Sequence, residues 1–364
     1  MSRLSRCFRS LESAGFFRVL DDSRVELLAH GHAYADLLKQ QWLSLRPLAA
    51  YLGTSDSSEA VFSTPLQRFS FARTERFRSH FEQLVREHPR KAKCPTLLKH
   101  LCTSSSSSCQ PEPFLGHKAP VTHLITDFLV EPYRALEHFY NMQRESKIWW
   151  MRYSSNPSRY RIVPHELPVE VDAKHCQAID IVCRFGEEVG VAVEQLSMVM
   201  LQGDDFRLPD ARTDQSLPPA VIRSVIELET ATCALLLDGC DHGRETQSLL
   251  LNRVLAPYQC GIACLKGDPA QPGDLADLCL HIKDVLHRAG LRLCQGDGYA
   301  LTKDASELRE HMEKSDMLGV PYTLLVSEQT LQNGLLQLRS RDTRLAETIH
   351  ISDVPDYLLN IFKH

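Results

Sequence analysis

The last third of the chain alternates short apolar runs with stretches of helical periodicity, and this order restricts the fold more than any other feature. Residues 258–265, YQCGIACL, form a continuous apolar run, which is typical of a strand covered on both faces. In residues 274–290 apolar side chains recur at helical spacing, with Asp274 able to cap the start and Gly290 the end. A buried strand followed by an amphipathic helix predicts a mixed α/β domain.

The rest of this region continues the alternation. It predicts, in chain order, a strand, a helix, three strands and a terminal helix, at residues 291–296, 306–319, 321–328, 335–341, 347–352 and 354–362. The strands on either side of Asn333-Gly334 are predicted to meet in a tight hairpin, because this pair favours the positive φ that both central residues of such a turn need. Ser352 or Asp353 is expected to cap the last helix.

The first two thirds of the chain contain longer elements. The patterns predict helices at 25–48 and 133–153, strands at 121–130, 178–185 and 189–201, a strand running into a helix at 219–240, and loops at 53–60 and 103–113. The second loop, TSSSSSCQPEP, is expected to be mobile on the surface, since it has little to bury. The polar residues 241–247 are the expected boundary between two domains, 1–245 and 246–364.

Charge and cysteine content exclude several classes of protein. The net charge of −5 argues against a surface that grips phosphate throughout, so nucleic-acid contacts must come from local basic patches. The twelve cysteines include no Cys-x-x-Cys pair, and we expect reduced, buried thiols in a reducing compartment. His30-Gly31-His32 has no matching Cys/His pair nearby, so no metal is expected. No apolar run approaches the roughly 20 residues that cross a bilayer.

Two basic stretches are candidate duplex-DNA contacts, because cations neutralise phosphates while interleaved aromatic rings stack. Any such contact would be independent of DNA sequence, since nothing resembles a groove-reading helix. The residues are Arg86, Arg90, Lys91 and Lys93 in the first stretch, and Arg144, Lys147, Arg152, Arg159 and Arg161 in the second. The alternative for the second stretch is a core that contains Trp149 and Trp150, with the arginines as its solvated rim.

The first twenty residues have two interpretations. They carry four arginines, four serines and a single acid, with Leu4, Phe8 and Leu11 on one helical face. This is the composition of a mitochondrial presequence. The alternative is an ordinary basic helix at the N-terminus of the fold.

The C-terminal motifs resemble those of a known family. Residues 330–343, TLQNGLLQLRSRDT, and 349–352, IHIS, follow the apolar strand at 258–265. Together they are similar to the anticodon-binding domain that ends class II aminoacyl-tRNA synthetases of the glycyl, prolyl, threonyl and histidyl group, over about residues 249–364. With residues 147–160, KIWWMRYSSNPSRY, these motifs resemble more closely the accessory subunit of animal mitochondrial DNA polymerase gamma, a family of derived synthetase-like proteins.

The resemblance implies both a fold and a function. The fold is α+β and α/β, with a degenerate class II synthetase-like core built on an antiparallel sheet and an anticodon-binding-type mixed-sheet domain after it. The function is that of a non-catalytic processivity subunit of the mitochondrial matrix, which binds the catalytic subunit and primer-template DNA and needs no cofactor. The expected partner-binding residues are Asn333, Gly334, Leu335, Arg339, Arg341 and Asp342. The alternative for Arg341-Asp342 is an internal salt bridge.

The ATP-binding motifs separate this function from its alternative, a tRNA-binding class II synthetase-like protein of the glycyl or prolyl type. In that group a Gly-x-Gly-x-x-Arg motif at a strand-to-helix turn binds the ATP γ-phosphate, where charge develops. Residues 230–233 read Thr-Ala-Thr-Cys at the corresponding turn, without glycine or arginine. Arg73-Thr74-Glu75 is only a weak match to the family's other ATP motif. The sequence therefore predicts a dead synthetase core.

The length of one interval predicts the oligomeric state. Vertebrate members of the polymerase-subunit family resemble one another in dimerising through an inserted helical segment. Residues 68–131 are too few to supply that segment, and the Ser-rich loop fills part of them. We therefore expect a monomer that pairs one-to-one with the catalytic subunit.

Overall fold

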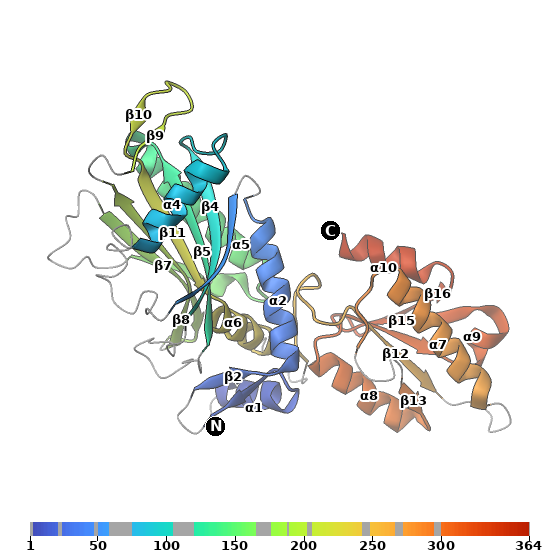
Figure 1. Ribbon diagram of the computed structural model, residues 1–364. Coiled ribbons are helices and arrows are strands. Elements are labelled where there is room, and N and C mark those ends of the chain that lie inside the picture. The colour runs from blue at the N-terminus through green and yellow to red at the C-terminus, as the bar shows by residue number, and fades with distance from the viewer. Residues whose placement is uncertain are drawn as a thin grey trace.

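The computed structural model folds into two lobes, each built on its own β-sheet (Figure 1). The described residues are 3–20, 24–46, 50–57, 75–104, 120–164, 176–187, 189–201, 206–241, 248–265, 272–294 and 300–363. Two predicted loops therefore fall largely outside them, namely residues 105–113 of the Ser-rich stretch and residues 242–247 of the expected domain boundary.

A seven-stranded sheet forms the centre of the first lobe. Its order is β3-β4-β5-β11-β8-β7-β6, and all neighbours are antiparallel except β3 and β4. The strands are β3 (Ala50–Ser57), β4 (Thr96–Ser104), β5 (Val121–Val130), β6 (Tyr160–Pro164), β7 (Cys176–Phe185), β8 (Val189–Met200) and β11 (Ala220–Glu227). Two short ribbons flank it, β1 (Phe17–Val19) with β2 (Val25–Leu27) and β9 (Leu208–Pro209) with β10 (Ser216–Leu217).

Helices cover both faces of this sheet. On one face pack α2 (Ala29–Ser44), α5 (Ala135–Tyr153) and α6 (Leu228–Cys240), around a core that includes Trp42, Trp149 and Trp150. The opposite face carries α4 (Glu75–Glu87), which buries Phe77 and Phe81 and lies in front of the sheet in Figure 1. The core interpretation of the two adjacent tryptophans is thus confirmed.

A buried carboxylate ties α5 to the sheet. Glu194 is 2% exposed, yet its oxygens accept hydrogen bonds from Trp150 Nε1 at 2.7 Å, Ser146 Oγ at 2.9 Å and Ser224 Oγ at 2.6 Å. Three donors from α5 and β11 offset the loss of water around the charge. They fix the helix that carries one set of predicted DNA contacts.

The second lobe holds a mixed five-stranded sheet, as the strand and helix alternation predicted. Its order is β13-β12-β14-β15-β16, parallel among β13, β12 and β14 and antiparallel from β14 to β16. The strands are β12 (Cys260–Leu265), β13 (Ala300–Thr302), β14 (Tyr322–Val326), β15 (Leu335–Ser340) and β16 (Ala346–His350). The helices are α7 (Pro272–Arg288), α8 (Ala305–Met317), α9 (Glu328–Asn333) and α10 (Val354–Phe362).

The predicted tight hairpin at Asn333-Gly334 is wrong. Strands β14 and β15 are antiparallel neighbours, but the six-residue helix α9 joins them. Ser327 and Thr330 form a capping box at its start, and Gly334, with φ of 73°, ends it in the left-handed conformation. The glycine therefore has the positive φ that was expected, in a helix cap instead of a two-residue turn.

Other element predictions also differ from the structure. Leu293 makes only an isolated bridge to Cys260, so residues 291–294 form no continuous strand. Residues 53–57 belong to β3 instead of a loop, and residues 25–27 form β2 before the first long helix begins. Asp353 occupies the N-cap of α10, but its side chain makes no capping hydrogen bond.

The N-terminal residues form a helix that packs into the first lobe. In α1 (Arg3–Ser13) the side chains of Cys7 and Leu11 are buried in the same core as α6. Arg3 pairs with Asp241 at the end of α6. This packing supports the interpretation of the segment as a basic helix of the fold.

The eleven cysteines of the described residues are all free thiols, as the sequence predicted, and most are buried. Among the same residues, no helix combines the length and the apolar character needed to span a membrane.

Candidate nucleic-acid and partner interfaces

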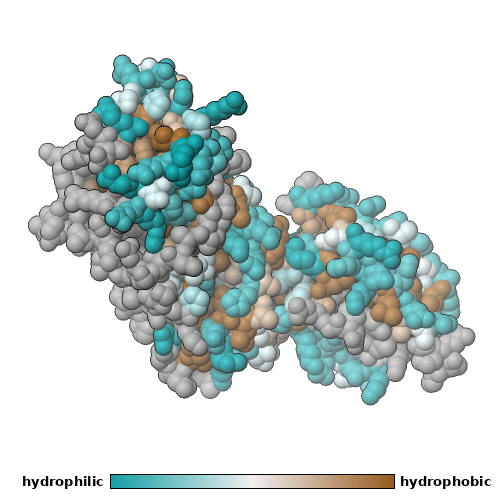
Figure 2. Space-filling view, viewed as in Figure 1, coloured by the Kyte–Doolittle hydropathy of each residue, from teal (hydrophilic) through white to brown (hydrophobic). Residues whose placement is uncertain are grey.

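The first predicted set of DNA contacts lies at the end of α4 and in the loop after it. Arg86, Arg90, Lys91 and Lys93 are all exposed, and hydrophilic side chains cover α4 in Figure 2. Arg86 lies 3.4 Å from Glu87, and Lys93 lies 3.2 Å from Asp214. Both pairs are open to water and therefore weak, so these cations remain accessible to phosphates.

Most of the second set also faces solvent. Arg144 and Arg152 are exposed on α5, Lys147 is half-buried on the same helix, and Arg161 is exposed on β6. The neighbouring tryptophans are buried, so they cannot stack on bases. These four residues fit the rim of a core better than a basic and aromatic platform.

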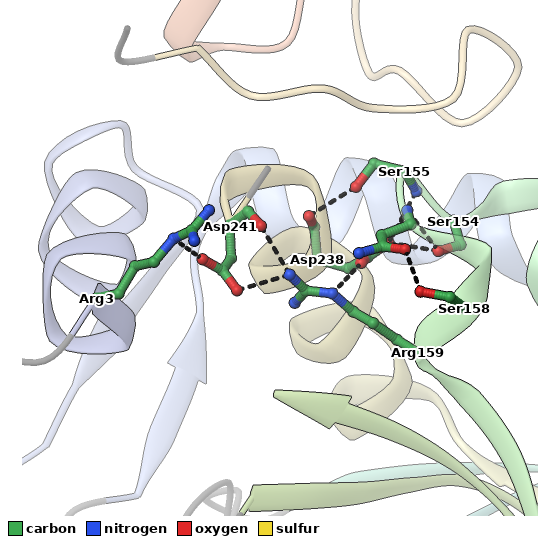
Figure 3. Close-up of polar contacts among 8 residues, drawn as sticks. Arg3, Ser154, Ser155, Ser158, Arg159, Asp238 and Asp241 are labelled. Carbon is green, nitrogen blue, oxygen red and sulfur yellow. Dashed lines mark hydrogen bonds and ion pairs between the residues drawn. The ribbon is translucent and has the colours of Figure 1, made fainter. Parts of the chain in front are cut away.

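Arg159 differs from the others, because its guanidinium is bonded inside the protein (Figure 3). Its Nη2 donates to Asp241 Oδ2 at 2.6 Å, and its Nε lies 3.2 Å from Asp238 Oδ1. Asp238 is fully buried and also accepts hydrogen bonds from Ser154 Oγ at 2.6 Å and from the Ser155 amide at 2.8 Å. The geometry therefore gives Arg159 a structural role, and the prediction of a DNA contact at this residue is not supported.

The sequence analysis missed an apolar stripe on the outer face of the helix that begins near residue 133. Tyr133, Leu136, Tyr140 and Ile148 are 60%, 47%, 58% and 53% exposed. Their spacing places them along one face of a helix, which the sequence pattern alone could have revealed. Arg212 Nη2 donates to the Tyr133 hydroxyl at 2.8 Å, so a cation accompanies this stripe.

Arg341, one of the predicted partner contacts, is bonded inside the protein. Arg341 is 3% exposed and donates to the carbonyl oxygens of Leu249, Gly319 and Leu251 at 2.9, 2.7 and 3.0 Å. Its other donors bond Asp342 Oδ1 at 2.7 and 2.9 Å, which is the internal salt bridge considered as the alternative. A guanidinium with this many internal acceptors is a scaffold group, not a free contact.

Arg339 is engaged in the same way. Its Nη1 and Nη2 form a bidentate pair with the carboxylate of Asp316, both at 2.8 Å. This pair ties β15 to the end of α8 and leaves little of either side chain exposed. The predicted partner contacts at Arg339 and Arg341 are therefore not supported, because both guanidinium groups are bonded inside the protein.

The remaining predicted partner residues are accessible. Asn333 and Leu335 are exposed, and Asp342 is half-buried. A Cβ atom on Gly334 would lie 2.5 Å from His350 Nε2, which explains why glycine suits this position in addition to its positive φ. The second lobe has further exposed apolar side chains that the sequence analysis did not select, namely Leu331 on α9, Leu345 in the turn before β16 and Tyr357 on α10.

The strand-to-helix step from β11 to α6 is filled with side chains. Thr230, Ala231, Thr232 and Cys233 are at most 1% exposed, and Thr230 Oγ1 donates to Glu227 Oε1 at 2.5 Å. On the face of the sheet that α4 covers, Arg223 of β11 forms a bidentate pair with Asp127 of β5. No group of His, Cys, Asp and Glu side chains in the described part of the chain is arranged to hold a metal.

The carboxyl group of Glu229, in the first turn of α6, is expected to make the stability of the protein depend on pH. Burial raises the pKa of its carboxyl to about 7, although Oε2 accepts a hydrogen bond from the Thr122 amide at 2.9 Å. The folded state then keeps this proton to a higher pH than the unfolded state. Stability contributed by the protonated form therefore falls as pH rises from about 4.5 to 7.

We expect Glu229→Gln to raise the free energy of unfolding by about 1 to 3 kcal/mol at pH 8 and to change it little at pH 5. The amide oxygen of glutamine can still accept from Thr122, so only the charge is removed. Denaturant unfolding at the two pH values measures the difference. An equal effect at both would mean that the carboxylate ionises normally in the folded state.

Both lobes are similar to known proteins. The family model described as anticodon binding domain matches residues 259–361. The chain is 64% identical over the full length of both chains to the mitochondrial DNA polymerase subunit gamma-2 of Drosophila melanogaster. It is 30% identical over 240 residues to that subunit of Xenopus laevis, which covers 59% of this chain and 48% of the frog protein. It is 22% identical over 322 residues to a glycine–tRNA ligase of Alkaliphilus oremlandii, covering 84% and 64%.

Proposed function

Because this chain belongs to the DNA polymerase subunit gamma-2 family, we propose that it is a non-catalytic accessory subunit that makes mitochondrial DNA polymerase more processive. The observation that carries the proposal is the 64% identity over full length to the fly polymerase subunit, which spans both lobes. The protein is mitochondrial and shares its ancestry with class II synthetases. The proposal assigns different tasks to two domains, residues 1–245 and 246–364.

The closed strand-to-helix step supports a role without synthetase chemistry. A phosphate at this turn would need backbone amides that glycine leaves open and a cation to hold its charge. Buried threonine, alanine and cysteine side chains occupy residues 230–233 instead. We therefore propose that the ability to activate an amino acid with ATP has been lost.

The catalytic subunit binds the second domain in this proposal. The surface runs along the β15–β16 hairpin. It extends from the end of α9 and the start of β15, where Asn333 and Leu335 are exposed, to the turn at the other end of the hairpin, where Leu345 is 73% exposed. Strand β16 is also the edge of its sheet. Exposed apolar side chains beside an open strand edge are typical of a protein-binding surface.

The effect on DNA follows from simple kinetics. A docked subunit adds cationic groups, here Arg86, Arg90, Lys91 and Lys93 of the first domain, to those of the polymerase. The complex then leaves primer-template DNA more slowly, and each binding event extends the primer further. The contacts are to phosphates, so the gain should shrink as salt concentration rises. The proposed complex contains one copy of each subunit.

Primer extension by the catalytic subunit, with and without this chain over a salt series, tests the proposal. We expect longer products at every salt concentration at which the complex forms. Leu335→Asp places a charge on the proposed surface and should remove most of the stimulation. Leu280→Asp is the matched control, because Leu280 is exposed to a similar extent on α7.

Unchanged product length on addition of the chain would contradict the proposal. Robust ATP–pyrophosphate exchange by the purified protein would contradict the loss of synthetase activity and favour the tRNA-binding alternative. Sedimentation of the isolated chain tests its oligomeric state, and a stable dimer would contradict the one-to-one complex.

A further inference from the structure

A cavity of about 570 Å³ opens in the first lobe between α5, the start of β4 and the loop after α4. Its apolar walls come from Leu97 and Phe128 of the sheet and from Met142 of α5. Cations gather at its rim, namely Arg46, Arg90, Lys91 and Lys93, and its polar lining also includes Asn141 and Glu145. The cavity lies on the face of the sheet that α5 covers, opposite to α4.

The protein fixes one of these cations in place. Arg46 has φ of 58°, a conformation that residues other than glycine rarely adopt. It follows the end of α2, whose carbonyl oxygens at Trp42 and Leu43 accept from Lys99 Nζ at 2.8 and 3.1 Å. Lys99 is 2% exposed. A buried lysine thus holds the end of the helix that positions Arg46 over the cavity.

The side chain of Arg46 is also oriented by bonds to α5. Its Nη2 donates to Ser146 Oγ at 3.1 Å, and its Nε lies 3.3 Å from Glu145 Oε2. Glu145, the acid of the cavity lining, is therefore already paired with a cation. On the opposite rim Arg90 and Lys93 are exposed, and the pair of Lys93 with Asp214 is open to water. These side chains can turn towards an anion at little cost.

We propose that this cavity binds a nucleotide. The volume lies within the range of small-molecule sites, which combine apolar walls with a few polar groups. Arg46, Arg90 and Lys93 suit a phosphate group, because guanidinium and ammonium donors form strong charge-assisted hydrogen bonds with its oxygens. The walls formed by Phe128 and Met142 suit the flat, weakly polar face of a base. The nucleotide is either free in solution or the 5′-phosphorylated end of a DNA strand.

Equilibrium titration of the full chain with dATP, with a 5′-phosphorylated oligonucleotide and with inorganic phosphate tests this site. Asn141→Phe fills the cavity from an exposed position of α5 without changing charge. The pair Arg90→Gln and Lys93→Gln removes two rim charges. The control pair, Arg144→Gln and Arg152→Gln, removes two charges of similar exposure from α5 outside the cavity.

We expect one molecule of dATP, or one phosphorylated strand end, to bind per chain. Both cavity variants should weaken that binding by about tenfold or more, and the control pair by less than about twofold. Binding of dATP identifies a free nucleotide, whereas binding of the oligonucleotide alone identifies a strand end. The proposal is overturned if neither binds saturably, if phosphate alone binds as tightly as dATP, or if the control pair weakens binding equally.

The cavity shares Arg90 and Lys93 with the proposed DNA contacts, so Asn141→Phe, which leaves these cations in place, separates the nucleotide site from the accessory role. Asn141→Phe lies away from the proposed partner surface, so its stimulation of primer extension should match that of the unmodified chain. Lack of nucleotide binding together with normal stimulation would overturn the nucleotide site and leave the accessory function intact.

Discussion

Replacing Arg341 by alanine is expected to lower the free energy of unfolding by about 3 to 5 kcal/mol. The guanidinium donates to three backbone carbonyls and to one carboxylate, and all but 3% of the residue is buried. Alanine would leave the carbonyl oxygens of Leu249, Leu251 and Gly319 without these donors in a space too closed for full hydration. The cost of unsatisfied buried acceptors, not the lost ion pair alone, makes the effect large.

The positions of these carbonyl oxygens mean that Arg341→Ala should also affect the connection between the two lobes. Leu249 and Leu251 belong to the segment that follows α6, and their side chains lie in the core of the first lobe. Arg341 lies at the end of β15 in the second lobe, so its bonds connect the two lobes. We expect Arg341→Ala to loosen this connection and to reduce stimulation of the polymerase indirectly.

Thermal or denaturant unfolding, measured alongside primer extension, separates this explanation from a direct partner contact. Arg309→Ala is the matched control, since Arg309 is exposed on α8 and alanine favours a helix there. The control should keep both its stability and its activity. An Arg341→Ala chain with normal stability and no stimulation would restore Arg341 to the partner surface.

The sequence predicted the long elements well because their patterns extend over several turns or alternations. Strand 121–130 was placed at its observed limits, and the strand-to-helix transition within 219–240 is β11 followed by α6. Short elements contain too few residues for the periodicity of their apolar side chains to be recognised. Helix α9 has only six residues, so the prediction followed the turn-forming Asn-Gly pair and missed the helix that begins after Ser327.

The site residues were harder to predict than the fold, for a physical reason. An arginine in a basic motif is the same residue type whether it faces DNA or a buried carboxylate. Arg159 bonds Asp238 and Asp241, about eighty positions away, and Arg339 bonds Asp316 across the lobe. The spacing of residues along the sequence does not identify ion-pair partners that are so far apart in the chain. Arg90, in contrast, is exposed, as a DNA contact requires, and its contact with DNA stays a prediction.

The ion pair between Asp127 and Arg223 gives the second large expected effect. Arg223 Nε and Nη2 lie 2.5 and 2.6 Å from the two carboxylate oxygens, with side-chain exposures of 7% and 0%. The guanidinium also lies 5.7 Å from the centre of the Phe77 ring on α4. The pair therefore links adjacent strands β5 and β11 beneath the helix that leads to the predicted DNA contacts.

We expect Asp127→Ala alone to destabilise the protein by about 3 to 5 kcal/mol, because it leaves Arg223 charged, buried and without its carboxylate. Arg223→Met alone should cost a similar amount, since it leaves a fully buried aspartate. The double variant Asp127→Leu with Arg223→Met should lie much closer to the unmodified chain, because both charges and their desolvation are removed together.

Urea unfolding of the two single variants and the double variant measures this coupling directly. A strong coupling energy with a stable double variant would mean that the pair specifies the arrangement of β5, β11 and α4 more than it stabilises it. Losses that simply add would show that each side chain acts through separate neighbours, and the bidentate pair would then have no special role. Primer extension by the double variant decides whether the polymerase needs the charges themselves, and we expect its stimulation to be retained because neither side chain reaches the surface.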